Sequence, residues 1–304
     1  MTSTTGSATT GSATPVVVIT GAGGGLGAAT AALYSDRGWH VVAVDLTAPP
    51  GGPGITSVAA DVTDSASLRS LADRVRSEHG RLDVVVTFAG VLGIGPLAET
   101  DPDRVQQVLD VNIMGTVRTV HAMFDLLRAS GGRVVLISSE TGPQHGMPMN
   151  GAYAMSKHAI EAYGDALRRE LMFLGLEVVL IQPGPFRTGM TASIRRRFQE
   201  STLPGSPFAA MAAVMGEMAA GEDDKAAAPS VLAEAVWTAG TTARPRHRYA
   251  VRWDLGRRLL DHLPVPMVDK VLTLALRGRI NATELALRRE SADILDAADA
   301  RGRP

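Results

Sequence analysis

The stretch Pro15-Val16-Val17-Val18-Ile19-Thr20-Gly21-Ala22-Gly23-Gly24-Gly25-Leu26-Gly27 decides the fold of this 304-residue chain. It begins with a β-branched apolar run, which is typical of a strand buried on both faces of a parallel sheet. A glycine-rich turn follows and leads into a helical pattern over 28–37. Backbone N–H groups at such a helix start can approach a pyrophosphate closely, and the helix dipole favours its negative charge. Strand, turn and helix together therefore indicate a dinucleotide site.

A second apolar run, 41–44, ends in a carboxylate, Asp45. A carboxylate at this point can accept hydrogen bonds from both hydroxyls of an adenosine ribose and would repel a 2′-phosphate. Leu46 and Thr47 follow, so no adjacent cation is available to bind such a phosphate. We therefore predict NAD(H) rather than NADP(H) as the cofactor. The alternative is that Asp45 only ends the strand.

The rest of the chain alternates strand and helix patterns. Further strands are expected at 58–60, 82–86, 132–139, 177–181 and, as a seventh, within 244–251; helices are expected at 65–78, about 103–129, 152–174 and 230–240. This alternation predicts an α/β fold, a Rossmann-type doubly wound parallel sheet of about seven strands. Ligands bind at the carboxyl ends of the strands in such sheets.

Tyr153 and Lys157 stand four residues apart in the helical pattern that follows the fifth strand. On a helix both side chains lie on one face. At roughly 4 Å and an effective dielectric near 20, a cation stabilises a phenolate by about 4 kcal/mol. The pair is therefore expected to bring the pKa of the phenol towards neutrality and to make it a proton donor and acceptor. The alternative is two side chains that merely share a face.

Composition excludes several other kinds of function. Hydrophobic residues make up 45% of the chain and charged residues 20%, with a formal net charge of -1, so no strong field attracts nucleic acid. There is no cysteine, which excludes disulfides and thiol nucleophiles and is compatible with the cytoplasm. No metal site is expected, because the seven histidines include no i, i+4 pair. No apolar stretch approaches the ~18 residues of a membrane span.

Four regions are expected along the chain. Residues 1–14 have the composition of a flexible leader, and 15–252 form the catalytic domain. Within it, 190–229 is rich in Met, Ala, Gly and Pro and is expected to be a substrate lid. Residues 253–304 are expected to be a helical C-terminal extension, amphipathic over 255–276 and interrupted by Pro264 and Pro266. Packing within a homodimer or homotetramer is its expected use, and the alternative is that the tail lies on a membrane surface.

Seven motifs occur in the order typical of one family. They are Thr20-Gly21-x-x-x-Gly25-x-Gly27, Asp61-Val62, Ala89-Gly90, Asn112, Ser138-Ser139, Tyr153-x-x-x-Lys157, and Pro183-Gly184 with Thr188. On these motifs the chain resembles the short-chain dehydrogenase/reductase family from Val16 to Val251. Within the family it is most similar to the branch that acts on steroids and retinoids.

The resemblance implies a role for each motif. Tyr153 would be the general acid and base, and Lys157 would bind the nicotinamide ribose and lower the pKa of the phenol. Ser139 would hydrogen-bond the substrate oxygen, and Asn112 would hold a water that links Lys157 to solvent; the alternative for Asn112 is a core amide. The residues implied to hold NAD are Gly21, Gly25, Leu26, Gly27, Asp45, Asp61, Val62, Ala89, Gly90, Tyr153, Lys157, Pro183, Gly184 and Thr188.

Two departures from the family pattern concern the pocket. Thr87-Phe88 stands where the family usually has two asparagines, and the loop from Ser139 to Tyr153 is one residue longer than usual. The implied activity is hydride transfer between NAD(H) and a secondary alcohol or ketone, with a bulky, hydrophobic, steroid- or retinoid-like substrate. The alternative is a non-catalytic, dinucleotide-sensing interaction protein on the same fold.

Overall fold

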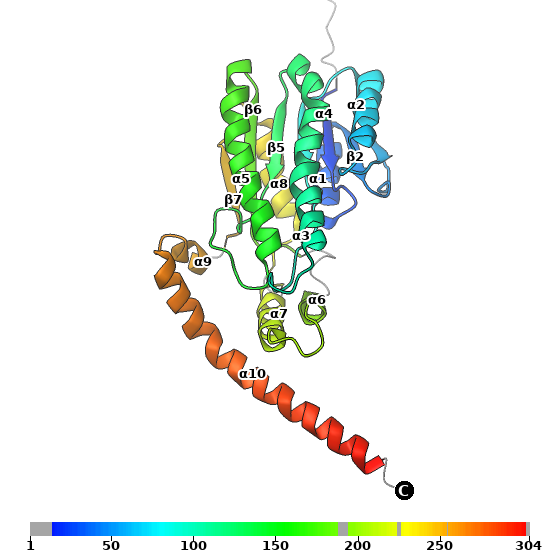
Figure 1. Ribbon diagram of the computed structural model, residues 1–304. Coiled ribbons are helices and arrows are strands. Elements are labelled where there is room, and N and C mark those ends of the chain that lie inside the picture. Colours follow the sequence, from blue (N-terminus) through cyan, green and yellow to red (C-terminus); the bar gives the residue numbers. More distant parts are fainter. Residues whose placement is uncertain (1–13, 188–193, 224–225, 254, 302–304) are drawn as a thin grey trace, which may run out of the picture.

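The computed structural model describes residues 14–187, 194–223, 226–253 and 255–301. The expected α/β architecture is confirmed: seven parallel strands form one sheet in the order β3-β2-β1-β4-β5-β6-β7, with helices on both faces (Figure 1). The strands are β1 (Val16–Thr20), β2 (His40–Asp45), β3 (Ile55–Ala59), β4 (Val84–Thr87), β5 (Arg133–Ile137), β6 (Glu177–Pro183) and β7 (Arg248–Val251).

The helices connect these strands and then extend beyond the sheet. They are α1 (Gly25–Asp36), α2 (Ser65–His79), α3 (Pro102–Leu109), the π-helical η1 (Asp110–Met114), α4 (Gly115–Ser130), α5 (Gly151–Leu171), the 3-10 turn η2 (Met172–Leu174), α6 (Ile194–Gln199), α7 (Ala209–Asp223), α8 (Pro229–Thr241), α9 (Leu255–Leu260) and α10 (Val265–Arg301). None of these described helices combines the length and the apolar composition that crossing a bilayer requires.

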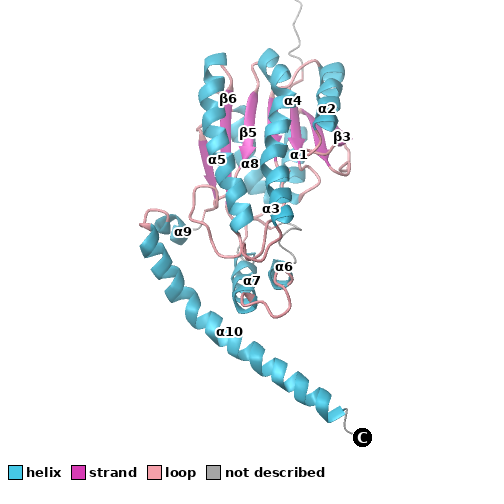
Figure 2. Cartoon of the chain, viewed as in Figure 1, coloured by secondary structure: helices cyan, strands magenta, loops and turns pink. Residues whose placement is uncertain are grey.

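Two apolar layers form the core because successive strand residues point to opposite faces of the sheet. In β1, Val16 and Val18 pack in the layer covered by α2, α4 and α5, whereas Val17 and Ile19 pack in the layer covered by α1 and α8. Figure 2 shows the strands lying between these helices. The continuous apolar run in β1 therefore reflects burial on both faces, as its composition predicts.

The helical region expected at 103–129 contains one irregular turn. Residues 110–114 form η1, a π-helical turn between α3 and α4. Asn112 is buried within this turn, and Gly115, which follows it, lies so close to Val62 that an added Cβ would stand 2.7 Å from the valine Cγ2. A π turn inserts one extra residue into a helix and is common at functional sites.

The C-terminal extension is helical and interrupted, as expected: α9 ends at Leu260 and α10 begins at Val265, directly after Pro264. Pro266 lies in the first turn of α10, where its missing N–H breaks no hydrogen bond, so it begins the helix rather than interrupting it. The helix then continues to Arg301, within the helical extension expected over 253–304 and past its amphipathic stretch, which ends at 276. It packs on α7 through Leu276, which shares a small apolar cluster with Met215. Figure 1 shows α10 leaving the domain beside α9 and extending beyond α7.

The third strand also differs from the expectation, since β3 begins at Ile55 instead of Val58. Its first four residues are only partly buried. β3 is the edge of the sheet, and an edge strand needs less apolar sequence than a central one. The run Ile55-Thr56-Ser57 was therefore too polar to be recognised.

The contact between α1 and α8 gives a stability prediction. An added Cβ on Gly240 would overlap the hydroxyl of the buried Tyr34. We expect Gly240→Ala to lower the free energy of unfolding by about 1–3 kcal/mol through overpacking, measured by urea denaturation. Tyr34→Phe in the same background should recover part of the loss by removing the hydroxyl. Gly278→Ala, on open helix surface, is the control; an equal loss there would contradict this explanation.

Candidate active site

The residues singled out in the sequence gather at one edge of the sheet. Because the sheet is parallel, the carboxyl ends of all its strands meet there. Gly21 follows β1, Asp45 ends β2, Gly90 follows β4, Ser139 follows β5 and Pro183 ends β6. The strand order reverses between β1 and β4, and this is the position where doubly wound sheets bind ligands.

The glycine turn lines a cavity of about 720 Å³ at this edge. Gly21 has a φ of +72°, and an added Cβ there would stand 2.6 Å from the Ala89 nitrogen. An added Cβ on Gly27 would overlap the Gly21 carbonyl oxygen. Helix α1 begins after Gly24 without a side-chain cap, so its first N–H groups are left for a ligand. The shape and donors of this turn fit the pyrophosphate of a dinucleotide.

Asp45 lies against the same turn. Its Oδ2 accepts a hydrogen bond of 2.9 Å from the Gly23 N–H, and its Oδ1 accepts one of 2.7 Å from the Leu46 N–H. A carboxylate offers about four acceptor positions, so about two remain for ribose hydroxyls. The carboxylate is thus fixed beside the glycine turn with acceptor capacity to spare.

The expected adenine neighbours are held by local contacts. Asp61 Oδ1 accepts hydrogen bonds from the Thr63 N–H and hydroxyl, at 2.8 and 2.7 Å. Val62 packs beside Gly115, and Gly90 lies beside Asn112, with the Asn112 Oδ1 3.2 Å from where a Cβ would stand. The structure brings these residues to the crevice; their contact with adenine stays a prediction.

Asn112 is 1% exposed and braces the loop after β4. Its Nδ2 donates to the Val91 carbonyl at 3.0 Å and to the Ser156 hydroxyl at 2.9 Å, while its Oδ1 accepts from the Val91 N–H at 2.8 Å. Both amide hydrogens are therefore used within the protein. The structure favours the core-amide interpretation of this side chain, and the bridging water stays a prediction.

Tyr153, Ser139 and Lys157 come together where α5 passes the end of β5. Ser139 hydrogen-bonds Tyr153, whereas the Ser138 hydroxyl is buried without a partner among the described residues. Of the two serines, Ser139 is the one that acts on the Tyr153 phenol, and its contact with the substrate oxygen stays a prediction. Lys157 Nζ lies 5.6 Å from the centre of the Tyr153 ring and donates a 2.9 Å hydrogen bond to the Ile137 carbonyl.

The expectation that Lys157 lowers the pKa of Tyr153 is wrong for this arrangement. Burial raises the pKa of Tyr153 above its usual value, the hydrogen bond from Ser139 opposes that change, and the Glu140 carboxylate adds to it. Burial also lowers the pKa of Lys157 to about 8. Desolvation is the largest of these effects on Tyr153, so it sets the direction in which the pKa of the phenol moves.

A second, smaller cavity of about 170 Å³ contains Tyr153. Its other walls are largely apolar and come from the loops after β4 and β5 and from α6 and α7. Leu92 lines this cavity and the glycine-lined one, so the two are neighbours at Leu92. The apolar lining residues are Leu92, Ile94, Met147, Pro148, Ile194, Phe198, Met215, Met218 and Ala219. Residues of the expected lid therefore face Tyr153, while 190–193, 224 and 225 lie outside the described residues.

Other expected site residues show mixed outcomes. Gly184 donates from its N–H to the Val251 carbonyl at 2.9 Å, and an added Cβ would overlap the Arg252 carbonyl. Thr188 lies outside the described residues. The buried Thr87 hydroxyl makes no hydrogen bond among the described residues. Thr87 therefore does not replace the hydrogen bonds that the family's asparagine would make at this position.

Glu140 was not recognised as a site residue from the sequence. It is 5% exposed, and its N–H donates to the Pro183 carbonyl at 2.8 Å. Its carboxylate raises the pKa of Tyr153. A charged residue directly after a buried strand and a serine pair was the available signal.

Comparison with known proteins places the chain among dehydrogenases. The short chain dehydrogenase family model matches residues 15–199. Retinol dehydrogenase 5 of Homo sapiens is 32% identical over 86% of this chain and 88% of its own length. A 3-ketodihydrosphingosine reductase of Bacteroides thetaiotaomicron is 35% identical over 64% of this chain and 71% of its own. A short-chain dehydrogenase from Streptomyces avermitilis shares the fold, with a TM-score of 0.68 at 23% identity over 91% of this chain and 98% of its own.

The glycine turn gives a binding prediction. Gly27→Ala should weaken NADH binding at least ~10-fold, a cost of about 1.4 kcal/mol, because the turn must move to clear the Gly21 carbonyl. Gly24→Ala is the matched control, since its Cβ would meet only the Gly21 oxygen, at 3.4 Å, and it should bind nearly normally. Fluorescence titration measures both. Equal affinities for the two variants would show that the close approach at Gly27 does not shape the site.

Proposed function

Because the chain belongs to the short-chain dehydrogenase family, in its retinol dehydrogenase-like branch, we propose that it transfers hydride between NAD(H) and a secondary alcohol or ketone. One observation carries the proposal: the glycine-lined cavity and the apolar cavity meet at Leu92, and Tyr153 stands in the apolar one. A bound nicotinamide dinucleotide supplies or accepts the hydride. The residues of the chain bind the dinucleotide, orient the substrate and transfer the proton.

Tyr153 is the proposed general acid and base. Since its pKa is raised, the phenol carries its proton throughout the neutral range and can donate it to the oxygen of a ketone. In the reverse direction the phenolate must accept the alcohol proton, and its population rises with pH. Ser139, hydrogen-bonded to Tyr153, would orient the substrate oxygen between the two hydroxyls.

Lys157 is the proposed holder of the nicotinamide ribose. An ammonium has three donors, and one of them is used by the Ile137 carbonyl. The other two are available for ribose hydroxyls. With a pKa of about 8, Lys157 is mostly charged at neutral pH and loses that charge in mildly alkaline solution.

The preference for NAD(H) rests on Asp45. Its two engaged oxygens keep the carboxylate beside Gly23, where a 2′-phosphate would meet a fixed negative charge. Two arginines, Arg104 and Arg197, also line the glycine cavity. Neither lies at the end of β2, which faces the adenine ribose in this fold class, so neither is placed to bind a 2′-phosphate there. We therefore propose NAD(H) as the preferred cofactor.

The proposed substrate is hydrophobic. Methionine, leucine, isoleucine and phenylalanine side chains line the cavity around Tyr153, and flexible methionines adapt to apolar ligands. The volume of about 170 Å³ is below the roughly 300–1,000 Å³ usual for drug-sized ligands. A steroid- or retinoid-sized substrate would therefore require α6 and α7 to move away from Tyr153. The cytoplasmic location and the homodimer or homotetramer stay predictions.

Replacing the phenol tests the chemistry. Tyr153→Phe should leave NADH affinity within about threefold of wild type, while kcat falls by about 10³-fold or more because the proton donor is lost. Secondary alcohols, steroids and retinoids are screened for NADH production to choose the substrate. Turnover unchanged in the variant would refute the mechanism. Tight NADH binding with no turnover of any alcohol or ketone by the wild type would favour the sensing alternative.

Replacing the carboxylate tests the cofactor. Wild-type protein should bind NADH more tightly than NADPH. Asp45→Ala should lower the ratio of the NADPH dissociation constant to the NADH dissociation constant by about tenfold, because one repulsive contact of about 1.4 kcal/mol is removed. Asp45→Asn, which keeps the size of the side chain, should also narrow it. Fluorescence titration with both dinucleotides gives the ratio. Tighter NADPH binding by the wild type would overturn this assignment.

A further inference from the structure

Helix α5 carries four polar side chains in one row. Tyr153, Lys157, Glu161 and Asp165 follow one another at four-residue spacing, so each lies about one turn from the next on the same face. Tyr153 and Lys157 belong to the site described above. Glu161 has no part in it, although it is only 9% exposed.

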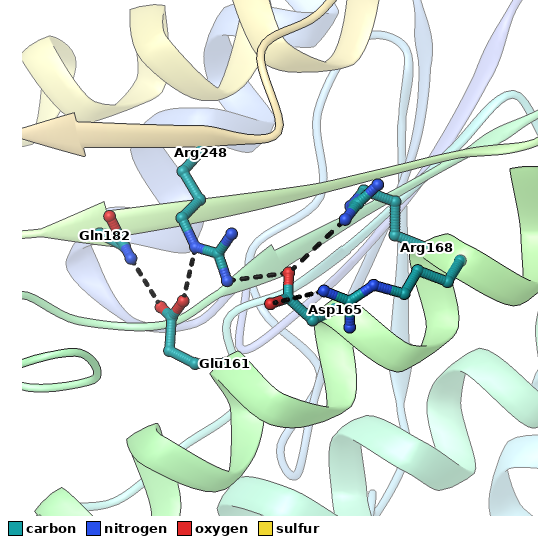
Figure 3. Close-up of polar contacts among 6 residues, drawn as sticks. Glu161, Asp165, Arg168, Gln182 and Arg248 are labelled. Carbon is teal, nitrogen blue, oxygen red and sulfur yellow. Dashed lines mark hydrogen bonds and ion pairs between the residues drawn. The ribbon is translucent and has the colours of Figure 1, made fainter.

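Two residues from neighbouring strands hold the Glu161 carboxylate. Gln182 of β6 donates from Nε2 to Oε1 at 2.9 Å, and Arg248 of β7 donates from Nε to Oε2 at 3.0 Å. Arg248 also forms an ion pair of 2.9 Å with Asp165. Figure 3 shows the guanidinium lying between the two carboxylates. Both Glu161 oxygens therefore have a fixed direction and a donor.

The outer end of the row is more open. Arg168 and Arg169 lie 4.0 and 3.7 Å from the Asp165 carboxylate, and Figure 3 shows Arg168 on the side of Asp165 away from Glu161. From the site outward the charges alternate in sign: Lys157, Glu161, Arg248, Asp165 and then the two arginines. The inner members are buried and the outer ones reach the surface.

A buried carboxylate is costly, and replacing a buried ion pair by apolar residues is often neutral or stabilising. The cluster is therefore weak evidence for a stabilising role. Lys157 provides a different reason for the cluster, because this residue is 7% exposed and its ammonium donates a hydrogen bond to the neutral Ile137 carbonyl. The other charged side chain near this pair, Glu140, acts on Tyr153. On the α5 row, Glu161 is the anion one turn from Lys157.

We propose that Glu161 is a positioning residue whose fixed negative charge keeps the buried Lys157 protonated, and that Arg248 limits the strength of that charge. The row thus connects the edge strand β7 with the ribose-binding ammonium. The consequence for turnover rests on the proposed function, whereas the effect on Lys157 itself does not.

The effect of Glu161 on the pKa of Lys157 has the direction that this geometry requires. Burial lowers the pKa of Lys157 to about 8, and the Glu161 carboxylate acts in the opposite sense. Without that carboxylate the pKa would be lower still, and the lysine would be largely neutral near physiological pH. The positive charge of Arg248 opposes the effect of Glu161 on Lys157, because Arg248 is paired with the same carboxylate.

The direct test is a titration of Lys157 by NMR of protein labelled with 13Cε-lysine. The chain has three lysines, Lys157, Lys225 and Lys270, so Lys225→Arg and Lys270→Arg assign the signals. Glu161→Gln should move the Lys157 midpoint down by about 2 pH units, as expected for a unit charge about 6 Å away at an effective dielectric near 20. Arg248→Gln should move it up, because Glu161 is then less compensated.

Opposite shifts are the signature that a structural role would not give. Glu170→Gln is the matched control, since it removes the same charge from an exposed position near the end of α5 and should leave the midpoint unchanged. Thermal melting identifies any variant that has lost its fold, and Arg248→Gln still tests the proposal if Glu161→Gln does not fold. Unchanged midpoints, or shifts of both variants in one direction, would overturn the proposal.

Cofactor binding provides the second readout. The pH at which NADH affinity weakens should follow the Lys157 midpoint in all three proteins. Compared with wild type, this pH should be lower in Glu161→Gln and higher in Arg248→Gln. If the midpoints shift as expected but wild-type protein turns over no alcohol or ketone, the proposed function fails and the charge relationship stands. If turnover is found and the midpoints do not shift, the charge relationship between Glu161 and Lys157 fails and the proposed function stands.

Discussion

The close approach of two backbones at the centre of the sheet constrains the rest of the site. Gly21, directly after β1, lies against the Phe88–Ala89 backbone, which directly follows β4, with no room for a side chain on Gly21. These are the strands between which the sheet order reverses. Because the two strand ends meet without side chains, the helix that follows β1 can present bare N–H groups to the crevice. The large cavity along the glycine turn follows from this contact.

The two halves of the site depend on different physics. The dinucleotide half is built largely from backbone, whose hydrogen-bonding groups keep the same charge at any pH. The half around Tyr153 is built from buried ionisable side chains, whose protonation states depend on the surrounding polarity. Burial raises the pKa of the phenol and lowers that of the lysine, and it does so through the same apolar surroundings. The alternating charges along α5 then act on the lysine within this poorly solvated region.

Sequence periodicity was sufficient for the fold, because apolar runs and helical patterns alternate without ambiguity over most of the chain. The order and spacing of the motifs were sufficient to predict that Ser139, Tyr153 and Lys157 lie together. The direction of the Tyr153 pKa was not predictable, because it depends on burial by loops and helices far along the chain rather than on the i, i+4 neighbour. The break between α9 and α10 lies at Pro264, whereas Pro266 lies in the first turn of α10, and the sequence pattern does not distinguish these two positions. The apolar cavity was equally hidden, since its walls come from five separate segments.

The π-helical turn at 110–114 has a consequence for how the sequence can change during evolution. Each added residue rotates a helix by about 100°, so α3 and α4 present their buried faces out of phase with a regular helix. Deleting one residue here would restore regular hydrogen bonding and at the same time rotate α3 relative to Thr116, Thr119 and Val120, which α4 buries. Local helix regularity and the placement of Asn112 therefore impose opposing selection on the length of this segment. The length of this segment, as well as the identity of Asn112 within it, is therefore a property that lineages carrying this site would be constrained to keep.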